Sequence, residues 1–278
     1  MKKQTLILIL ACLTIVAILV FVLMGKDIRA TPSIEASSVL VINTKQEKEL
    51  FAKDVNRAVP IASITKLMTT YLVLEAIHTK ALSWDEMLKL ERVDDPQAVS
   101  LYAKTGTKYY TVEDLFAAML ITSANDAAEA LAERVDAEHF TEKMNAKAKQ
   151  FGMSTKTYFS SASGLDKNGE MSVSTAADLM ILTKRLLHDF PEVLDTTSRT
   201  DYVTKNGDTI HTTNGALEED VVSGMDGLKT GYTDQAGYCL IGTAVQNGER
   251  IISITLGSSS DAGRTKDAKK MMEFGFSK

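Results

Sequence analysis

The sequence predicts an α/β protein of the α+β type, in which an antiparallel sheet built from both chain ends is flanked by helices. A helical lobe is expected to be inserted between the two halves of the sheet. Apolar runs of strand length lie near the start of the chain, at residues 38–44, and near its end, at residues 237–256. Between them, long stretches repeat their apolar residues with the period of a helix. The 278 residues are enough to bury one large core.

The first predicted elements are a strand at Ser38–Thr44, a turn at residues 45–47 and a hairpin partner at residues 49–52. A helix from Ser63 to about Ile77 follows. Pro60 suits the segment that leads into this helix, because proline cannot donate a hydrogen bond inside it. The helix offers a buried surface through Leu67, Met68, Tyr71, Leu72 and Leu74.

The middle of the chain predicts a helical lobe. Residues 82–110 are mixed and predict only short pieces of structure. Thr111 and the acidic residues after it are typical of a helix start, and an apolar helix continues to Ile121. The polar residues 122–126 interrupt the helical pattern. Further helices are predicted at residues 127–135, at residues 137–150 with Gly152 as the cap, and from Ser174 and Thr175 to about His188.

The last third of the chain predicts the rest of the sheet. Residues 200–226 indicate strands and loops. Two apolar strands, at residues 237–244 and 251–256, flank Asn247–Gly248, which is a strong signal for a hairpin turn. Residues 261–274 close the chain as a helix.

The N-terminus carries an uncharged apolar run from Thr5 to Met24. As a helix this run is about 30 Å long, which is enough to cross a bilayer. Its length and the lack of a clear cleavage site favour an uncleaved membrane anchor over a signal peptide. We therefore predict an anchor or signal segment with a short tether at residues 1–30, and a domain outside the cytoplasm at residues 31–278.

Composition argues against several classes of function. The net charge of −5 and the absence of a basic cluster argue against a nucleic-acid partner. The four histidines are scattered without a paired spacing, so we expect neither a metal nor a cofactor. Cys12 lies in the apolar run and cannot easily pair with Cys239, which is expected to be a core residue.

Ser63-x-x-Lys66 is the motif around which the chain is organised. Positions three residues apart share one face of a helix, so the hydroxyl and the amine can meet. A serine is a poor nucleophile until a base takes its proton, and a lysine is such a base only if its pKa is lowered. Taken alone, this pattern also fits a helix-capping serine and a solvated lysine.

Two further motifs carry polar groups suited to a ligand. Ser123 and Asn125 lie in the polar break between two buried helices. Lys229–Thr230–Gly231 leads into the apolar hairpin and is suited to binding an anion, with Gly231 allowing a ligand backbone to come close. A second Lys-Thr-Gly, at residues 104–106, precedes Ser123 and no apolar strand follows it, so we set it aside.

In this order and at these separations, the three motifs resemble those of penicillin-binding proteins and serine β-lactamases. The flanking residues at 62–69, 118–128, 226–232 and 236–238 resemble the low-molecular-mass D-alanyl-D-alanine carboxypeptidases, and the likeness covers roughly residues 35–276. The resemblance implies a β-lactamase/transpeptidase-like fold. Ser161 replaces the asparagine usual before Gly164. Many relatives continue into a β-rich domain and a C-terminal anchor, which the N-terminal span is expected to replace.

The resemblance also implies a role for each motif residue. Ser63 attacks the carbonyl of a terminal D-Ala-D-Ala bond, neutral Lys66 is the base with Lys229 helping to keep it neutral, and Ser123 relays the proton. The backbone N–H groups of Ser63 and Tyr232 form the oxyanion hole. The substrate-binding set implied is Asn125, Lys229, Thr230, Gly231 and Tyr232, with Arg264, in the loop before the last helix, as a further candidate.

The implied partners are a peptidoglycan pentapeptide ending in D-Ala-D-Ala, β-lactam antibiotics as covalent inhibitors, and the membrane through residues 5–24. A DD-endopeptidase would use the same chemistry. A class A β-lactamase would need a Glu-x-x-Leu-Asn loop between the second and third motifs, and Glu192–Val193–Leu194–Asp195 does not match it. A wall-binding scaffold without activity would have no need of Lys66.

Overall fold

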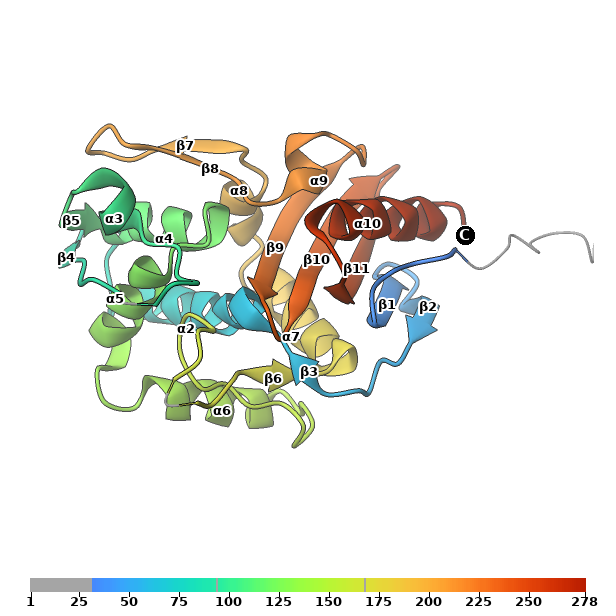
Figure 1. The fold of residues 1–278 in the computed structure, drawn as a ribbon, viewed down its shortest axis with the longest axis horizontal. Coiled ribbons are helices and arrows are strands. Elements are labelled where there is room, and N and C mark those ends of the chain that lie inside the picture. Colours follow the sequence, from blue (N-terminus) through green and yellow to red (C-terminus); the bar gives the residue numbers. More distant parts are fainter. Residues whose placement is uncertain (1–31, 94, 168) are drawn as a thin grey trace, which may run out of the picture. The chain divides into compact units, whose positions relative to one another are not determined.

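A five-stranded antiparallel sheet joins the two ends of the chain (Figure 1). The computed structural model describes residues 32–93, 95–167 and 169–278, of which Ile34–Lys278 form one unit. The strands lie in the order β2-β1-β11-β10-β9. Their bounds are β1 (Ser38–Asn43), β2 (Lys48–Lys53), β9 (Met225–Thr233), β10 (Gly237–Gln246) and β11 (Glu249–Ser258). The predicted sheet from both chain ends is confirmed.

Strand β1 lies inside this sheet, between its own hairpin partner β2 and the far strand β11. Ser38 is opposite Leu256 in the register. The predicted turn between β10 and β11 is also confirmed, since Asn247 and Gly248 both have positive φ angles, of 53° and 75°. Strand β9 is left at the edge of the sheet, where one row of backbone groups faces away from β10.

Alternating side chains of β1 point to opposite faces of the sheet and pack into two separate hydrophobic cores. Val39 and Val41 point to the face covered by α10 (Asp261–Phe276), where they pack with Met271 and Met272. Leu40 and Ile42 point to the opposite face and join the larger core. That larger core also contains most of the apolar side chains of the helical part of the chain.

The helical part lies between β2 and β9 in the sequence. Its longer helices are α2 (Lys66–His78), α4 (Val112–Ile121), α5 (Asn125–Asp136), α6 (Phe140–Gln150) and α7 (Ala176–Asp189). Helices α2, α4, α5 and α6 lie to one side of the sheet in Figure 1, whereas α7 packs against β1 and β11. The predicted apolar surface of α2 is buried. Two predicted helix starts are also confirmed, because Thr111 and Thr175 each accept a hydrogen bond from the backbone N–H three residues ahead. Ser260, which the sequence analysis did not single out, caps α10 in the same way.

Short elements fill the rest of the chain. Three pairs of short strands are β3 (Val59–Pro60) with β6 (Val173–Ser174), β4 (Met87–Lys89) with β5 (Tyr109–Thr111), and β7 (Asp201–Val203) with β8 (Thr209–His211). The short helices are η1 (Ala62–Thr65), α3 (Leu101–Thr105), α8 (Val193–Thr197) and α9 (Gly215–Glu218). Residues 82–110 therefore hold only short pieces of structure, as predicted.

Two sequence predictions need comment at this level. Arg264 does not lie in a loop before the last helix: α10 begins at Asp261, directly after its cap Ser260, so Arg264 is in the first turn of the helix. The predicted membrane anchor at residues 5–24 lies outside the described residues. Among residues 32–93, 95–167 and 169–278, none of the helices combines the length and the apolar character needed to span a bilayer.

Candidate active site

The serine and the lysine of the first motif meet at the junction of η1 and α2. Ser63 lies in a 3-10 turn, in which residues three apart are eclipsed, and Lys66 is the first residue of the α-helix that follows. Lys66 Nζ is 2.8 Å from Ser63 Oγ. Its other hydrogen-bond acceptor is the carbonyl oxygen of Ser163, at 2.7 Å. The predicted pairing of hydroxyl and amine is therefore present.

Lys66 is fully buried, and this burial sets its charge. Loss of hydration is the main cause that lowers the pKa of Lys66 to about 7, while the carboxylates of Glu129 and Asp126 oppose it. We expected Lys229 to help keep Lys66 neutral. Burial is the main cause for Lys66, and the pKa of Lys229 is also lowered, by its own burial and then by Lys66 and Arg264. Because repulsion between two amines is mutual, the contribution of Lys229 to the neutrality of Lys66 stays a prediction.

The loop at residues 160–165 supplies the carbonyl that holds Lys66. It lies directly against η1, since a Cβ on Gly164 would be 2.1 Å from the carbonyl oxygen of Ala62. Thr69 Oγ1 donates to the carbonyl of Ala162 at 2.6 Å. Ser161 donates to the carbonyl of Leu165 and accepts from the N–H of Gly164. These two hydrogen bonds close the loop.

The second motif lies where α4 ends and α5 begins. Ser123 has a φ angle of 65°, a strained conformation for a residue other than glycine, and it is nearly buried. Asn125 exchanges two hydrogen bonds with the backbone of Val99, because its N–H donates to the Val99 carbonyl and its Oδ1 accepts from the Val99 N–H. Because the Oδ1 of Asn125 is used in this way, the NH₂ group of its side chain is the part suited to bind a ligand.

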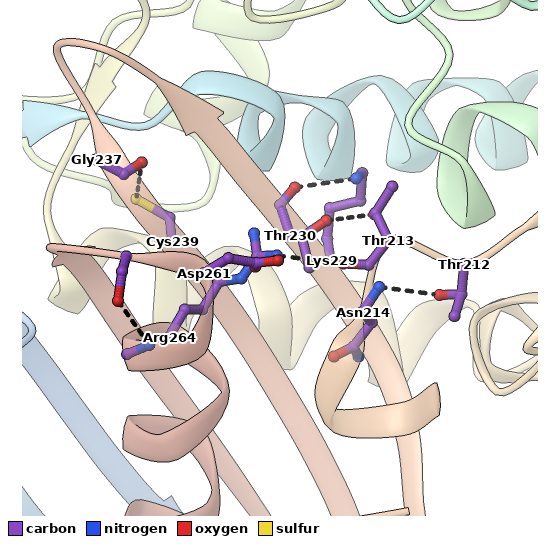
Figure 2. A network of polar contacts seen from close by, with 11 residues as sticks. Thr212, Thr213, Asn214, Lys229, Thr230, Gly237, Cys239, Asp261 and Arg264 are labelled. Atoms are coloured by element: carbon purple, nitrogen blue, oxygen red, sulfur yellow. Dashed lines mark hydrogen bonds and ion pairs between the residues drawn. The ribbon is translucent and has the colours of Figure 1, made fainter. Parts of the chain in front are cut away.

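The third motif lies on the edge strand β9. Lys229 is buried and its Nζ donates to the carbonyl of Thr230 at 3.0 Å. The side chain of Thr230 is joined to that of Thr213 by a 2.6 Å hydrogen bond between their hydroxyls (Figure 2). Thr213 precedes α9 and was not singled out in the sequence, because its contact with Thr230 bridges segments without a common motif.

Gly231 permits a close approach between two parts of the protein itself. A Cβ there would lie 2.9 Å from the carbonyl oxygen of Ile61 and 3.1 Å from the N–H nitrogen of Ile64. The backbone that comes close is therefore that of η1, and the glycine allows β9 to pack against the turn that carries Ser63. Tyr232, next in β9, is 44% exposed, and its ring lies 4.3 Å from that of Tyr238.

Arg264 lies beside the third motif although it comes from α10 (Figure 2). Its Nη2 donates to the carbonyl of Thr213 at 3.3 Å and also contacts the carboxylate of Asp261. The guanidinium lies 5.6 Å from the centre of the Tyr238 ring. The side chain is nearly buried, so this cation is fixed in place rather than solvated.

A cleft of about 550 Å³ collects the predicted site residues. Its lining includes Ser63, Ser123, Asn125, Thr230, Gly231, Tyr232 and Arg264. Lys66 and Lys229 lie buried behind its wall, each hydrogen-bonded to the lining. The cleft therefore offers a serine with an adjacent amine of near-neutral pKa and, farther along β9, hydroxyl and cationic groups that suit a carboxylate. This arrangement is suited to acyl transfer from a substrate with a free carboxylate.

The comparison with known protein families is specific. The family profile described as "D-alanyl-D-alanine carboxypeptidase" (peptidase S11) matches residues 26–260. D-alanyl-D-alanine carboxypeptidase DacF of Bacillus subtilis is 32% identical over 249 residues, which are 87% of this chain and 62% of that protein. The chain thus spans somewhat less than two thirds of the length of this curated relative.

The structural comparison agrees. Penicillin-binding protein D2 from Listeria monocytogenes in its cefotaxime-bound form is 48% identical and superimposes with a TM-score of 0.86, covering 89% of this chain and all of that one. Its ampicillin-bound form gives 47% identity, a TM-score of 0.85 and the same coverage. The β-lactamase/transpeptidase-like fold expected from the motifs is confirmed.

Proposed function

Because the chain belongs to the D-alanyl-D-alanine carboxypeptidase family of serine peptidases, we propose that it removes the terminal D-alanine from peptidoglycan stem peptides through an acyl-enzyme on Ser63. The observation that carries this proposal is the 2.8 Å contact between Ser63 Oγ and Lys66 Nζ at the wall of a cleft. A neutral amine has one lone pair and two N–H donors. With one donor used by the Ser163 carbonyl, the lone pair is available to the serine.

In the proposed reaction, Lys66 takes the proton of Ser63 as Oγ attacks the carbonyl carbon of the penultimate residue. The backbone N–H groups of Ser63 and Tyr232 stabilise the oxyanion, which is worth about 3–4 kcal/mol for each donor. Ser123 passes the proton to the leaving amine. Water then hydrolyses the ester and restores the hydroxyl of Ser63.

The substrate is held at both sides of the scissile bond. The NH₂ group of Asn125 binds a substrate amide. Lys229, Thr230 and Arg264 bind the terminal carboxylate, which supplies the negative charge that these fixed groups suit. Penicillins and related β-lactams are the expected covalent inhibitors. The two Listeria structures with cefotaxime and ampicillin support this.

A β-lactamase is less well supported. The nearest match to a deacylating glutamate motif begins at Glu192, and this residue lies before α8, where it pairs with His78 at 2.6 Å. Glu192 is not among the residues that line the cleft. We therefore expect slow hydrolysis of a penicilloyl ester. We further propose that the catalytic unit works outside the cytoplasm, at the cell membrane, because peptidoglycan lies there.

The test is the intact mass of the protein over time after mixing with a penicillin, with peptide mapping of the adduct. A lasting adduct of one drug mass on Ser63, together with D-alanine release from a peptide ending in D-Ala-D-Ala, is the expected result. An adduct that vanishes within seconds as drug is consumed would instead establish a β-lactamase. Release from cross-linked muropeptides, without release from the linear peptide, would establish an endopeptidase.

The matched variant is Ser63→Ala. It removes the nucleophile but no buried volume of consequence, so we expect no adduct and no D-alanine release, with a melting temperature within about 2 °C of the parent. If this variant released D-alanine at the parental rate, the assignment of Ser63 would be wrong. If the parent bound peptidoglycan without any adduct or release, a wall-binding scaffold would be the better description.

A further inference from the structure

Helix α5 presents a carboxylate to the back of the lysine pocket. Glu129 is one helical turn after Asn125, and its Oε1 accepts a hydrogen bond from the N–H of Ser163 at 3.2 Å. The carbonyl of the same Ser163 accepts from Lys66 Nζ at 2.7 Å. Glu129 therefore holds, through one residue, the only backbone carbonyl that the described residues offer to the lysine.

Glu129 reaches this position from outside the catalytic cleft. It does not line the cleft with Ser63, but a separate pocket of about 260 Å³, together with Glu133 and Lys167. Its side chain is half-buried. A substitution at Glu129 therefore removes no surface that touches a substrate in the cleft, which separates its effects on the lysine from effects on binding.

The charges that face Lys66 come from three elements. Asp126 and Glu129 project from α5, Lys229 lies on β9, and Arg264 of α10 stands behind Lys229. The two carboxylates raise the pKa of Lys66 against the effect of burial, and Glu129 is the larger of the two influences. Without them, the lysine would lose its proton even more readily and would be a weaker base.

The two carboxylates are not equivalent. Asp126 is buried and its oxygens accept from the N–H groups of Leu101 and Tyr102 and from the hydroxyl of Ser100, so it anchors the start of α3. Removing it would disturb the wall of the cleft. Glu129 instead accepts a hydrogen bond from Ser163, in the loop that holds Lys66.

We propose that Glu129 is a positioning residue for Lys66: it fixes the Ser163 carbonyl at the amine, and its negative charge lets the buried lysine hold the proton that Ser63 gives up. This inference rests on the proposed function, because it assigns a purpose to the base of that reaction. A lysine without this counter-charge would be neutral over a wider pH range, yet would accept the proton of Ser63 less readily in the transition state.

The experiment compares the pH dependence of acylation by a fluorescent penicillin in the parent, Glu129→Gln, Glu129→Ala and the control Glu133→Gln. Glutamine keeps an acceptor for the Ser163 N–H and removes the charge. Because the lysine then loses its proton at lower pH, we expect the rising limb of the Glu129→Gln profile to move to lower pH, and its plateau to fall. Glu129→Ala also frees the loop, so its plateau should fall further, by about tenfold or more relative to the parent.

Glu133 is the matched control because it lines the same pocket one turn along α5 and is exposed. Its variant should follow the parental profile. If the rise of the acylation rate occurred at the same pH in Glu129→Gln as in the parent, the inference would be wrong. It would also be wrong if Glu133→Gln shifted the rise equally, because any negative charge on α5 would then have the same effect.

A second measurement keeps the inference separate from the proposed function. The ε-methylene NMR signal of Lys66, assigned by its loss in Lys66→Met, reports the protonation of the amine whether or not the protein reacts with penicillin. We expect a lower pKa for Lys66 in Glu129→Gln than in the parent. An unchanged titration would overturn the inference even if Ser63 is acylated, whereas a parent that never forms an adduct would overturn the function alone.

Discussion

Folding takes the amine of Lys66 out of water, and the described residues offer it no direct ion pair. Its two hydrogen-bond acceptors, the hydroxyl of Ser63 and the carbonyl of Ser163, are uncharged. In the unfolded chain its pKa is near 10.5, and in the folded protein it is lowered to about 7. Burial of this amine therefore favours the neutral base but lowers the stability of the folded protein, as is common at reactive sites with perturbed pKa values.

This cost depends on pH, with a sign that follows from proton binding. Between pH 7 and 10.5 the unfolded chain binds more protons at this lysine than the folded protein does, so stability rises with pH across that window. Below about pH 7 the full cost is present, up to about 5 kcal/mol. We expect urea unfolding of the parent to gain stability relative to Lys66→Met as pH rises from 7 to 10. Parallel curves for the two proteins would contradict this.

The residues of the site were predictable in unequal degree. Helical spacing predicted that Ser63 and Lys66 can meet, because both belong to one local segment, but the same spacing also fitted a capping serine and a solvated lysine. Joining them to Ser123 and Lys229 required the likeness to a family, since no periodicity reports on contacts between remote segments. Thr213 and Glu129 were missed for the same reason: each acts through a hydrogen bond to a distant loop or strand.

At the scale of elements, the site depends on how closely β9 approaches η1. Strand β9 is an edge strand, and η1 packs against it and, less extensively, against β10. Gly231 permits this approach because a side chain there would meet the backbone at Ile61 and Ile64. The oxyanion donors proposed at Ser63 and Tyr232 belong to these two elements, so their separation is set by this packing.

Gly231→Ala should therefore impair acylation more than stability. The added Cβ pushes β9 away from η1, and a displacement of about 1 Å at such a site can cost about 100-fold in rate. Gly207→Ala is the control, because its Cβ would meet nothing within 4 Å although its φ angle of 86° makes alanine strained. We expect the control to lose stability without losing acylation, measured as the rate of penicillin adduct formation. Equal loss of acylation in both variants would show that strain alone explains the effect.

A second contact between elements fixes the opposite wall of the cleft. Asp126, at the start of α5, accepts the N–H groups of Leu101 and Tyr102, which begin α3. Asp126→Ala leaves these donors without their acceptor, at a cost of about 2–3 kcal/mol. We expect faster amide exchange at Leu101 and Tyr102 and slower acylation. Ser100→Ala removes the cap of α3 and one hydrogen bond to Asp126 but leaves both N–H groups their acceptor, so it should cost only about 1 kcal/mol. If amide exchange at Leu101 and Tyr102 were unchanged in Asp126→Ala, Asp126 would not anchor the start of α3.

Element boundaries were predicted best where a local signal marks them. Thr111 and Thr175 cap helices as their chemistry suggests, and Asn247–Gly248 makes the turn. The placement of Arg264 in a loop disagreed with the helix predicted at residues 261–274, which already contains this position. The helix α10 does begin at Asp261, after its cap Ser260, and the guanidinium lies near the ring of Tyr238.

For the whole molecule, one buried carboxylate ties the two ends of the described chain together. Asp267 of α10 accepts hydrogen bonds from the N–H groups of Glu35 and Ala36 and from the hydroxyl of Ser258. The partners are up to 232 residues apart in sequence. Periodicity predicted that both ends contribute to one sheet, but no local pattern could have identified the residue that links them.

Asp267→Ala should therefore destabilise the unit without altering the site. Leaving buried donors without an acceptor costs about 1–3 kcal/mol for each uncharged group, so we expect at least about 3 kcal/mol in total. The measurement is urea unfolding, with the penicillin acylation rate of the folded variant as the control. If the acylation rate of the folded variant fell in proportion to its stability, the hydrogen bonds of Asp267 would also affect the cleft, and the prediction would be wrong.

The pairing of β1 with β11 also limits the order in which the protein can form. Ser38 needs a partner at Leu256, so the first strand of the sheet emerges from the ribosome long before the strand that flanks it. Until then β1 and β2 form at most a hairpin, which is marginal by itself in water. Until β11 has been synthesised, the apolar faces of β1 and β2 stay exposed to chaperones or to aggregation. The nascent chain can thus assemble helices early, but it can acquire an acylating serine next to a completed sheet only after β9, β10 and β11 have followed.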